Sequence, residues 1–330
     1  MKFVRPMIAS ALVLIVATGC SSAVSAVPPP QSAVVIYEPA LDGTYRLDLD
    51  GKHVLVNGKA MHAPPAPSLF AIRSACSHSG CVATGTLLQG DDSKRATDYT
   101  VVLDYVNGGW QMAAPNTFSC PDDSTSPGVV AWFVKPGPGR TLVGTYYAAH
   151  AVGVDCVSAM QAPMTLTRVG DVDPAVAVAD PHAVPALSAS APDGLKGKYS
   201  QVNTYRGAGG APQTGEVEVQ AETVDMMTMC LRNTEQCWAL ATATYHGTTV
   251  QWPLAFANGV WSVSRRASRD EGCPDRSTTE MVMHSDYPMP QPPLNPVPQL
   301  TGTESLDFDS PSTPCAGAFA YDSVLKRTGS

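Results

Sequence analysis

Charged residues are scarce in this chain, since Asp, Glu, Lys and Arg together make up only 15% of its 330 residues, against roughly 25% in an average soluble domain. Positive charge is the scarcer sign, because 21 Lys and Arg face 29 Asp and Glu and give a formal net charge of −8. Nucleic acids and anionic lipid surfaces are bound mainly through Lys and Arg. We therefore expect no nucleic-acid partner and no electrostatic attachment to a membrane.

Catalytic signatures are also absent from the sequence. It contains no Gly-x-Ser-x-Gly, no His-Glu-x-x-His, no phosphate-binding Gly-rich loop and no EF-hand spacing. The seven histidines are scattered, and no two of them lie four positions apart. Asp122 and Asp123 follow Cys120-Pro121, and Asp275 follows Cys273-Pro274, where an aspartate is typical of a turn. We therefore predict a non-enzymatic protein with no catalytic residue, no metal site and no cofactor.

Long helical patterns are missing as well. No sustained 3.6-residue period of apolar residues is present, whereas Pro (29) and Gly (27) are frequent. Short strands alternate instead, as where Tyr45, Leu47 and Leu49 are separated by polar residues. Asn107-Gly108 lies between two such strands and is a strong hairpin signal, because both residues tolerate positive φ. This composition favours antiparallel strands joined by tight turns.

The amino terminus has the pattern of a secretory signal. Two positive charges in Met1–Arg5 precede the apolar run Met7–Ala17, which is shorter than the roughly 20 residues of a membrane-spanning helix. Ala17-Thr18-Gly19-Cys20 resembles a bacterial lipobox. The resemblance implies cleavage after Gly19, diacylglycerol on the Cys20 sulfur and acylation of the new amino group, and hence a lipid anchor on the outer face of the cell membrane. An ordinary signal peptide with a chance cysteine is the alternative.

Eight further cysteines are spread along the chain, and an even number in an exported protein indicates disulfides rather than a zinc site. They are Cys76, Cys81, Cys120, Cys156, Cys230, Cys237, Cys273 and Cys315.

These cysteines belong to two copies of one pattern. Tyr45 lies 31 positions before Cys76, and Tyr199 lies 31 positions before Cys230. Asn107-Gly108-Gly109-Trp110 matches Asn258-Gly259-Val260-Trp261, and the matched positions are offset by 151 to 159 residues. Ordered matches at a nearly constant offset indicate an internal duplication.

Disulfide pairing follows if each copy folds alone. We favour Cys76–Cys81 with Cys120–Cys156, and Cys230–Cys237 with Cys273–Cys315, and the crossed pairing within each copy is the alternative. The wide pairs close loops of roughly 35–40 residues, which the chain-entropy model values at about 3–4 kcal/mol each.

The predicted fold class is all-β, with two tandem antiparallel meander modules, each a small barrel or sandwich with two disulfides. The expected organisation is a signal peptide (1–19), a lipidated cysteine and flexible tether (20–40), a first β module (41–170), an Ala/Pro-rich linker (171–194) and a second β module (195–330).

The lipobox, the start Gly43-Thr44-Tyr45, the close cysteine pair followed by Val82-Ala83-Thr84, and the Asn-Gly-x-Trp hairpin together resemble a module of mycobacterial cell-envelope lipoproteins. Similar modules occur on extracytoplasmic ends of some actinobacterial membrane proteins, including kinases. The resemblance implies location and architecture, and it implies no activity.

We therefore expect a non-enzymatic lipoprotein of the cell envelope that is held to the membrane by its lipid anchor and binds a small or lipidic ligand or an envelope protein. Trp110 and Trp261 occupy matched positions and are the candidates for lining a ligand cavity, although a tryptophan there is more often a core anchor. The alternatives are a hydrolase acting on envelope polymers, with a site between the modules, and a purely structural or interaction module.

Overall fold

The computed structural model describes residues 40–64, 66–78, 80–90, 94–139, 141–208, 218–245, 248–269, 279–308 and 317–330. The predicted signal peptide, the Cys20 anchor and the tether up to residue 39 lie outside these ranges, as do Cys273, Asp275 and Cys315. All the described residues belong to one compact unit of the chain. Among them, no helix is long and apolar enough to cross a membrane.

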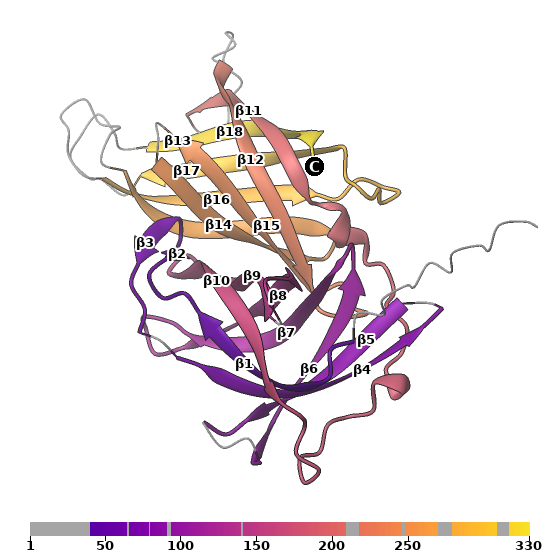
Figure 1. Ribbon diagram of the computed structural model, residues 1–330. Coiled ribbons are helices and arrows are strands. Elements are labelled where there is room, and N and C mark those ends of the chain that lie inside the picture. Colours follow the sequence, from indigo (N-terminus) through magenta and orange to yellow (C-terminus); the bar gives the residue numbers. More distant parts are fainter. Residues whose placement is uncertain are drawn as a thin grey trace, which may run out of the picture. The chain divides into compact units, whose positions relative to one another are not determined.

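Eight strands form a first antiparallel barrel, which closes where its first strand pairs with its last (Figure 1). They are β1 (Gly43–Leu49), β4 (Ser68–Ser77), β5 (Gly80–Leu88), β6 (Ala96–Val106), β7 (Gly109–Ser119), β8 (Thr125–Pro136), β9 (Thr141–Val152) and β10 (Cys156–Gly170). A short hairpin of β2 (Val54–Val56) and β3 (Lys59–Met61) extends the sheet at β10.

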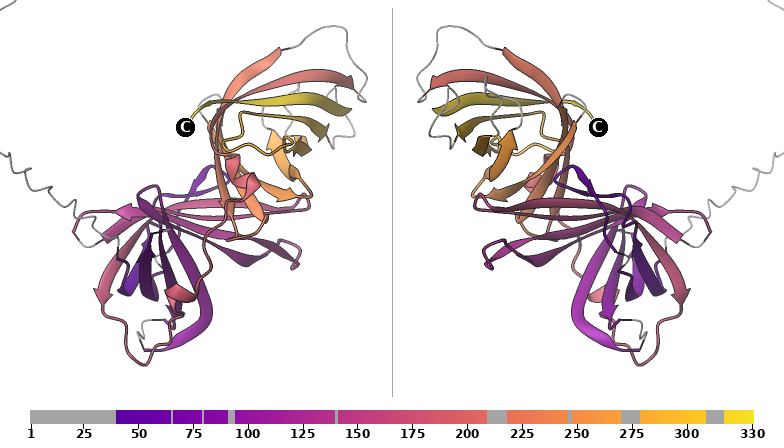
Figure 2. Two further views of the ribbon diagram at one scale, coloured as in Figure 1. Left: turned by 90° about the vertical axis from the view of Figure 1, so that its right-hand side faces the viewer. Right: turned by 90° about the vertical axis from the view of Figure 1, so that its left-hand side faces the viewer.

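Eight further strands form a second closed barrel with the same sequential order, which Figure 2 shows from two sides. They are β11 (Gly197–Ala208), β12 (Glu218–Cys230), β13 (Cys237–Tyr245), β14 (Thr248–Ala257), β15 (Val260–Arg269), β16 (Thr279–Pro288), β17 (Gln299–Phe308) and β18 (Gly317–Gly329). Two 3₁₀ turns, η1 (Pro181–Ala183) and η2 (Ala191–Gly194), lie between the barrels in sequence. The predicted all-β class with two tandem modules is confirmed, and the modules are barrels.

Three disulfides join cysteines within a barrel: Cys76–Cys81, Cys120–Cys156 and Cys230–Cys237. The first and third bridge residues that face each other at the ends of the β4–β5 and β12–β13 ladders. The second ties the β7–β8 turn to the start of β10. All three are pairings that the spacing favours over the crossed ones.

Strand β8 is apolar on both of its faces. Val130, Trp132 and Val134 point into the first barrel and join its core. Val129 and Ala131, which alternate with them, belong to a different cluster that contains Met229, Leu231 and Leu240 of the second barrel. The continuous burial of β8 arises because the barrel core covers one face and the second barrel covers the other.

The second barrel is open along part of one ladder. Strands β14 and β15 are paired only next to their hairpin, through Ala255↔Ser262, Phe256↔Trp261 and Ala257↔Val260. Beyond these pairs, within the described residues, β14 pairs only with β13 and β15 only with β16. We call the place where β14 and β15 cease to pair the second fork.

The β9–β10 turn of the first barrel meets β15 at the second fork. The backbone N–H of Arg266 donates to the carbonyl of Val154 at 3.0 Å, and its Nε donates to Asp155 Oδ1 at 2.7 Å. Val157, just beyond the turn, packs against the core of the second barrel. Part of the exposed strand edge is thus covered by the neighbouring barrel.

The linker between the barrels is packed rather than extended into solvent. Val176 is 4% exposed and lies against Ala71 and Leu88 of the first barrel. The hydroxyls of Thr84 and Thr86 on β5 donate to carbonyls of the linker residues Ala179 and Ala177.

Because Leu240 is buried in the apolar cluster that the two barrels share, we expect Leu240→Ala to lower the free energy of unfolding by about 2–5 kcal/mol. Leu240 is 3% exposed. The matched control is Leu294→Ala, because Leu294 is 47% exposed and its change should stay within about 0.5 kcal/mol. Urea unfolding measures both, and equal losses for the two variants would contradict the tight interface.

Candidate binding cleft

The first barrel also has a ladder in which the two strands stop pairing, and it is the ladder that corresponds to β14–β15 of the second barrel. Strands β6 and β7 pair only through Asp104↔Gln111, Tyr105↔Trp110 and Val106↔Gly109, next to their Asn107-Gly108 hairpin. Beyond these pairs, in the part of the chain that the structure describes, β6 pairs only with β5 and β7 only with β8. We call this place the first fork. A cavity of about 340 Å³ lies over it, and we name this cavity the β6–β7 cleft.

The walls of the β6–β7 cleft come from three stretches of the chain, namely strands β6 to β8, the end of the linker, and β12 with the loop after it. The lining residues are Val102, Asp104, Val106, Gln111, Met112, Ala113, Phe133, Leu187, Ser188, Ala189, Ser190, Asp193, Thr228, Met229, Cys230, Leu231, Arg232 and Asn233. Met112 is also a member of the first barrel's core. The cleft therefore reaches core side chains through the fork.

A bidentate ion pair between Arg232 and Asp104 lies at one side of the cleft. Arg232 donates from Nε to Asp104 Oδ2 at 2.9 Å and from Nη2 to Asp104 Oδ1 at 3.1 Å. The side chains of Arg232 and Asp104 are only 16% and 13% exposed. Arg232 Nη2 also donates to the carbonyl of Pro185 in the linker, at 2.6 Å. Bidentate pairs of this kind fix geometry as well as charge, so one side chain holds the second barrel, the first barrel and the linker together.

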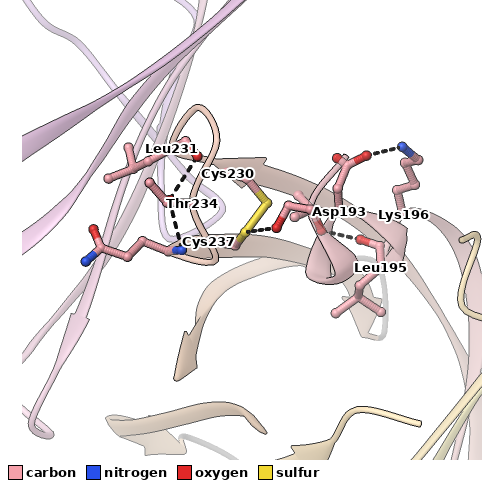
Figure 3. The surroundings of a disulfide bond; sticks show 10 residues. Asp193, Leu195, Lys196, Cys230, Leu231, Thr234 and Cys237 are labelled. Carbon is pink, nitrogen blue, oxygen red and sulfur yellow. Dashed lines mark hydrogen bonds and ion pairs between the residues drawn. A yellow bond between two sulfur atoms is a disulfide. The ribbon is translucent and has the colours of Figure 1, made fainter. Parts of the chain in front are cut away.

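The loop that carries Arg232 is held in shape by its own bonds. It is closed by the disulfide Cys230–Cys237, and Figure 3 shows this bridge beside Asp193 of the linker and Lys196, which form an ion pair at 2.7 Å. Leu231 N–H donates to the carbonyl of Gln236 at 2.9 Å across the loop. The arginine is thus presented by a cross-linked turn, which limits the entropy lost when the ion pair forms.

Asn233 fastens the same loop to the linker. Its Oδ1 accepts from the N–H of Ser188 at 2.8 Å and from the Ser188 hydroxyl at 3.0 Å, and its Nδ2 donates to the carbonyl of Ala186 at 3.0 Å. The φ of Asn233 is +56°, in the left-handed region that asparagine tolerates better than most residues.

The chemistry of the cleft suits binding. Its apolar wall includes Met112, Met229 and Phe133, and methionine side chains adapt to differently shaped ligands. Of its charged groups, Asp104 and Arg232 neutralise each other, and Asp193 forms an ion pair with Lys196. Among the described residues, no group of three or more His, Cys, Asp or Glu side chains is placed to hold a metal ion.

The two tryptophans singled out in the sequence lie in the barrel cores. Trp110 is 2% exposed and Trp261 is 0% exposed, and neither lines the β6–β7 cleft. Trp110 packs edge-on against Tyr105, with ring centroids 5.3 Å apart, and Trp261 lies beside Phe256 at 5.0 Å. Each tryptophan thus lies in the short paired stretch between a hairpin and its fork, with its side chain in the barrel core.

The aspartates considered as acids lie in a turn. Asp122 Oδ1 accepts from the N–H of Ser124 at 3.1 Å and from its hydroxyl at 2.6 Å, and these hydrogen bonds lower the pKa of the Asp122 carboxyl. Asp123 has a positive φ of 63°. Both are exposed and stand outside the β6–β7 cleft.

A serine, a histidine and an aspartate, the residue types of a catalytic triad, form a hydrogen-bonded row that no motif in the sequence indicates. Ser264 Oγ is hydrogen-bonded to His284 Nδ1 at 2.6 Å, and His284 Nε2 to Asp286 Oδ2 at 2.7 Å. The histidine and aspartate side chains are 46% and 40% exposed, on the outer surface of β15 and β16. The row does not lie in the β6–β7 cleft. Strong stabilisation of charge in a transition state requires a site from which water is excluded, and an exposed strand surface does not exclude water. Only the cross-strand register of Ser264 and His284 brings these residues together.

The second barrel holds a partly buried carboxylate. Glu304 accepts hydrogen bonds from Tyr287 Oη at 2.5 Å, Gln201 Nε2 at 2.8 Å and Asn203 Nδ2 at 3.0 Å. Burial raises the pKa of Glu304, although these hydrogen bonds and the charge of Arg265 oppose the rise.

The first barrel resembles a known sensor domain. Residues 38–183 match the family model of the PknI serine/threonine-protein kinase sensor domain. This match covers the first barrel and the first part of the linker. The matched domain is a sensor and not the kinase domain, which agrees with the prediction of a non-enzymatic protein.

Serine/threonine-protein kinase PknI of Mycobacterium bovis and PknI of Mycobacterium tuberculosis are each 30% identical to this chain over 175 residues. The alignment covers 49% of this chain, and the chain spans only 30% of the length of these curated relatives.

Two solved forms of the M. tuberculosis PknI sensor domain are also similar. The monomer form is 25% identical with a TM-score of 0.38, and covers 44% of this chain and 97% of its own. The dimer form is 24% identical with a TM-score of 0.32, and covers 37% and 82%.

Removing one partner of the Arg232–Asp104 ion pair should lower the free energy of unfolding, and the losses of the two single variants should not add in the double variant. We expect Arg232→Gln to lower the free energy of unfolding by about 3 kcal/mol, because it leaves Asp104 buried without its partner. The double variant Asp104→Asn/Arg232→Gln should lose less than Arg232→Gln alone, because no unpaired charge remains. Urea unfolding of the four proteins of the cycle measures this, and strictly additive losses would rule out the coupling.

The raised pKa of Glu304 predicts a pH dependence of stability. A carboxyl with a higher pKa in the folded than in the unfolded state binds its proton more tightly when folded, so stability falls as pH rises from the unfolded value near 4.5 through the folded value. Glu304→Gln should flatten the stability profile in that window, where one proton contributes at most about 1.4 kcal/mol per pH unit. Thermal unfolding between pH 4 and 8 tests it, and an unchanged profile counts against the shift.

Proposed function

We propose that this chain is a non-enzymatic, lipid-anchored binding protein of the cell envelope, which receives a small ligand or a segment of an envelope protein in the β6–β7 cleft. The observation that carries the proposal is the cavity of about 340 Å³ over the first fork. Small-molecule sites are concave and combine apolar walls with placed polar groups, and the β6–β7 cleft is concave, with ten apolar and eight polar residues in its lining.

Export and anchoring are supported by the sequence and by the disulfides. Three disulfides need an oxidising compartment outside the cytoplasm. The lipobox-like Ala17-Thr18-Gly19-Cys20 supplies an anchor, and two or more acyl chains hold a protein stably to a membrane. We therefore place the protein on the outer face of the cell membrane, with residues 20–40 as its tether and residues 41–170 and 195–330 as two modules joined by the linker 171–194.

A sensing role is supported by the similarity of the first barrel to a kinase sensor domain. In this chain the segment after the matched region is a second barrel, and Arg232 of that barrel closes the cleft against Asp104 of the first. An occupant of the cleft would contact both barrels. Its binding would therefore change the strength of the association between the two barrels.

Native mass spectrometry of the full protein, purified from its own membranes, tests the proposal. The mature chain should start at Cys20 and carry the added mass of a diacylglyceryl group and one further acyl chain. A fraction should carry an additional non-covalent occupant. Ala189→Trp, which fills the cleft from the exposed linker, should remove the occupant.

Ala186→Trp is the matched control, because Ala186 is also exposed on the same linker and does not line the cleft. A wild-type protein that carries no occupant, or an occupant that survives Ala189→Trp, would refute the proposed site. An unmodified Cys20 would refute the anchor.

A further inference from the structure

We infer that the occupant of the β6–β7 cleft is an extended peptide segment of another protein, which joins the first fork through main-chain hydrogen bonds. This inference rests on the proposed function and selects one class of ligand from those that the function allows.

The orientation of the main chain at the first fork follows from its hairpin. The loop has two residues, Asn107 and Gly108, both at positive φ, so the pair that flanks it, Val106↔Gly109, is a hydrogen-bonded pair. Such pairs alternate along an antiparallel ladder. Asp104↔Gln111 is therefore the next, and Val102 and Ala113 would be the one after.

Val102 and Ala113 do not pair with each other, and both line the β6–β7 cleft. The N–H and C=O groups of these two residues therefore face the cavity rather than β5 or β8. They form a short open ladder at the point where the two strands cease to pair.

The second fork supports this assignment, because the same alternation agrees there with a hydrogen bond of the structure. Counting from the hydrogen-bonded pair Ala257↔Val260 places the N–H of Arg266 on the open side of β15. That N–H donates to the carbonyl of Val154 at 3.0 Å. At the second fork, therefore, the open edge is met by the main chain of another segment.

Open main-chain groups decide between a peptide and a lipid. A hydrocarbon chain in the cleft would displace water from the N–H and C=O of Val102 and Ala113 and leave them without partners, at about 1–3 kcal/mol for each group. A peptide segment can supply both donors and acceptors, as in strand addition to a sheet edge. Its side chains would lie against Met112, Met229 and Phe133.

A proline limits how long the added segment can be. Arg266 lies five residues after Trp261, and the residue five after Trp110 is Pro115. Since proline has no N–H, strand addition along β7 cannot continue past Ala113 in the same pattern. The site thus suits a short extended segment rather than a long strand.

The probe is the acetylated and amidated peptide with the sequence of residues 151–157 and the change Cys156→Ser, because this turn is the segment that meets the second fork. Binding to the full protein is followed by the amide signals and hydrogen exchange of Val102 and Ala113. Both amides should shift and become protected. The same peptide with methylated backbone nitrogens should bind roughly five- to tenfold more weakly, since one or more hydrogen bonds are lost.

The protein variant Ala113→Pro removes the N–H at the fork and should weaken the peptide to a similar degree. Its matched control is Thr117→Pro, which lies on the same strand, on the same side of the ladder and outside the cleft, and should leave the affinity unchanged. Thermal unfolding shows whether both variants fold, and the methylated peptide tests the inference even if Ala113→Pro does not.

Palmitate is the competing probe. If palmitate binds in a way that Ala189→Trp abolishes, while the peptide leaves Val102 and Ala113 unaffected, the peptide inference is overturned and the proposed binding function stands. If the methylated and unmethylated peptides bind equally, the main-chain mechanism is wrong. If neither probe binds and the purified protein carries no occupant, the inference and the proposed function both fall.

Discussion

The edge of a β-strand exposes a row of unpaired N–H and C=O groups, and such an edge has to be paired, covered or interrupted. Both barrels create this problem at the same place, just beyond an Asn-Gly hairpin whose following tryptophan fills the core. At the second fork, Val154 and Asp155 of the first barrel meet the N–H and the guanidinium of Arg266. At the first fork, Pro115 interrupts the strand edge, since proline has no N–H. The linker and the Arg232 loop cover this edge and leave a cavity between themselves and the strands.

The functional consequences follow from this difference. The covered second fork joins the barrels, together with the apolar faces around Ala131 and Leu240. The roofed first fork leaves a cleft whose closure depends on the Arg232–Asp104 pair and on the loop bridged by Cys230–Cys237. The same break in strand pairing therefore lies against the other barrel in the second barrel, and in the first it leaves the cleft that we propose as the binding site.

Local features of the structure could be predicted from the sequence, because they depend on neighbouring residues. The alternation around Tyr45 and Leu47, the Asn107-Gly108 turn and the stapled pair Cys76–Cys81 are of this kind. The Arg232–Asp104 pair could not be predicted, since its residues lie 128 positions apart and no local pattern links them. The outer face of β8 was equally hidden, because a strand buried on both faces reads only as an apolar run. The tryptophans drew attention as candidate ligand contacts, whereas the cleft is built from residues without a motif.

The most direct measurement of the account is native-state hydrogen exchange at two matched strands of the ligand-free protein. The N–H of Arg266 is bonded to the neighbouring barrel, while the N–H of Ala113 faces the cleft. We predict that the N–H of Arg266 exchanges as slowly as the core of the second barrel and that the N–H of Ala113 exchanges orders of magnitude faster. Fast exchange at Arg266, or protection of Ala113 equal to that of the β7–β8 ladder, would contradict it.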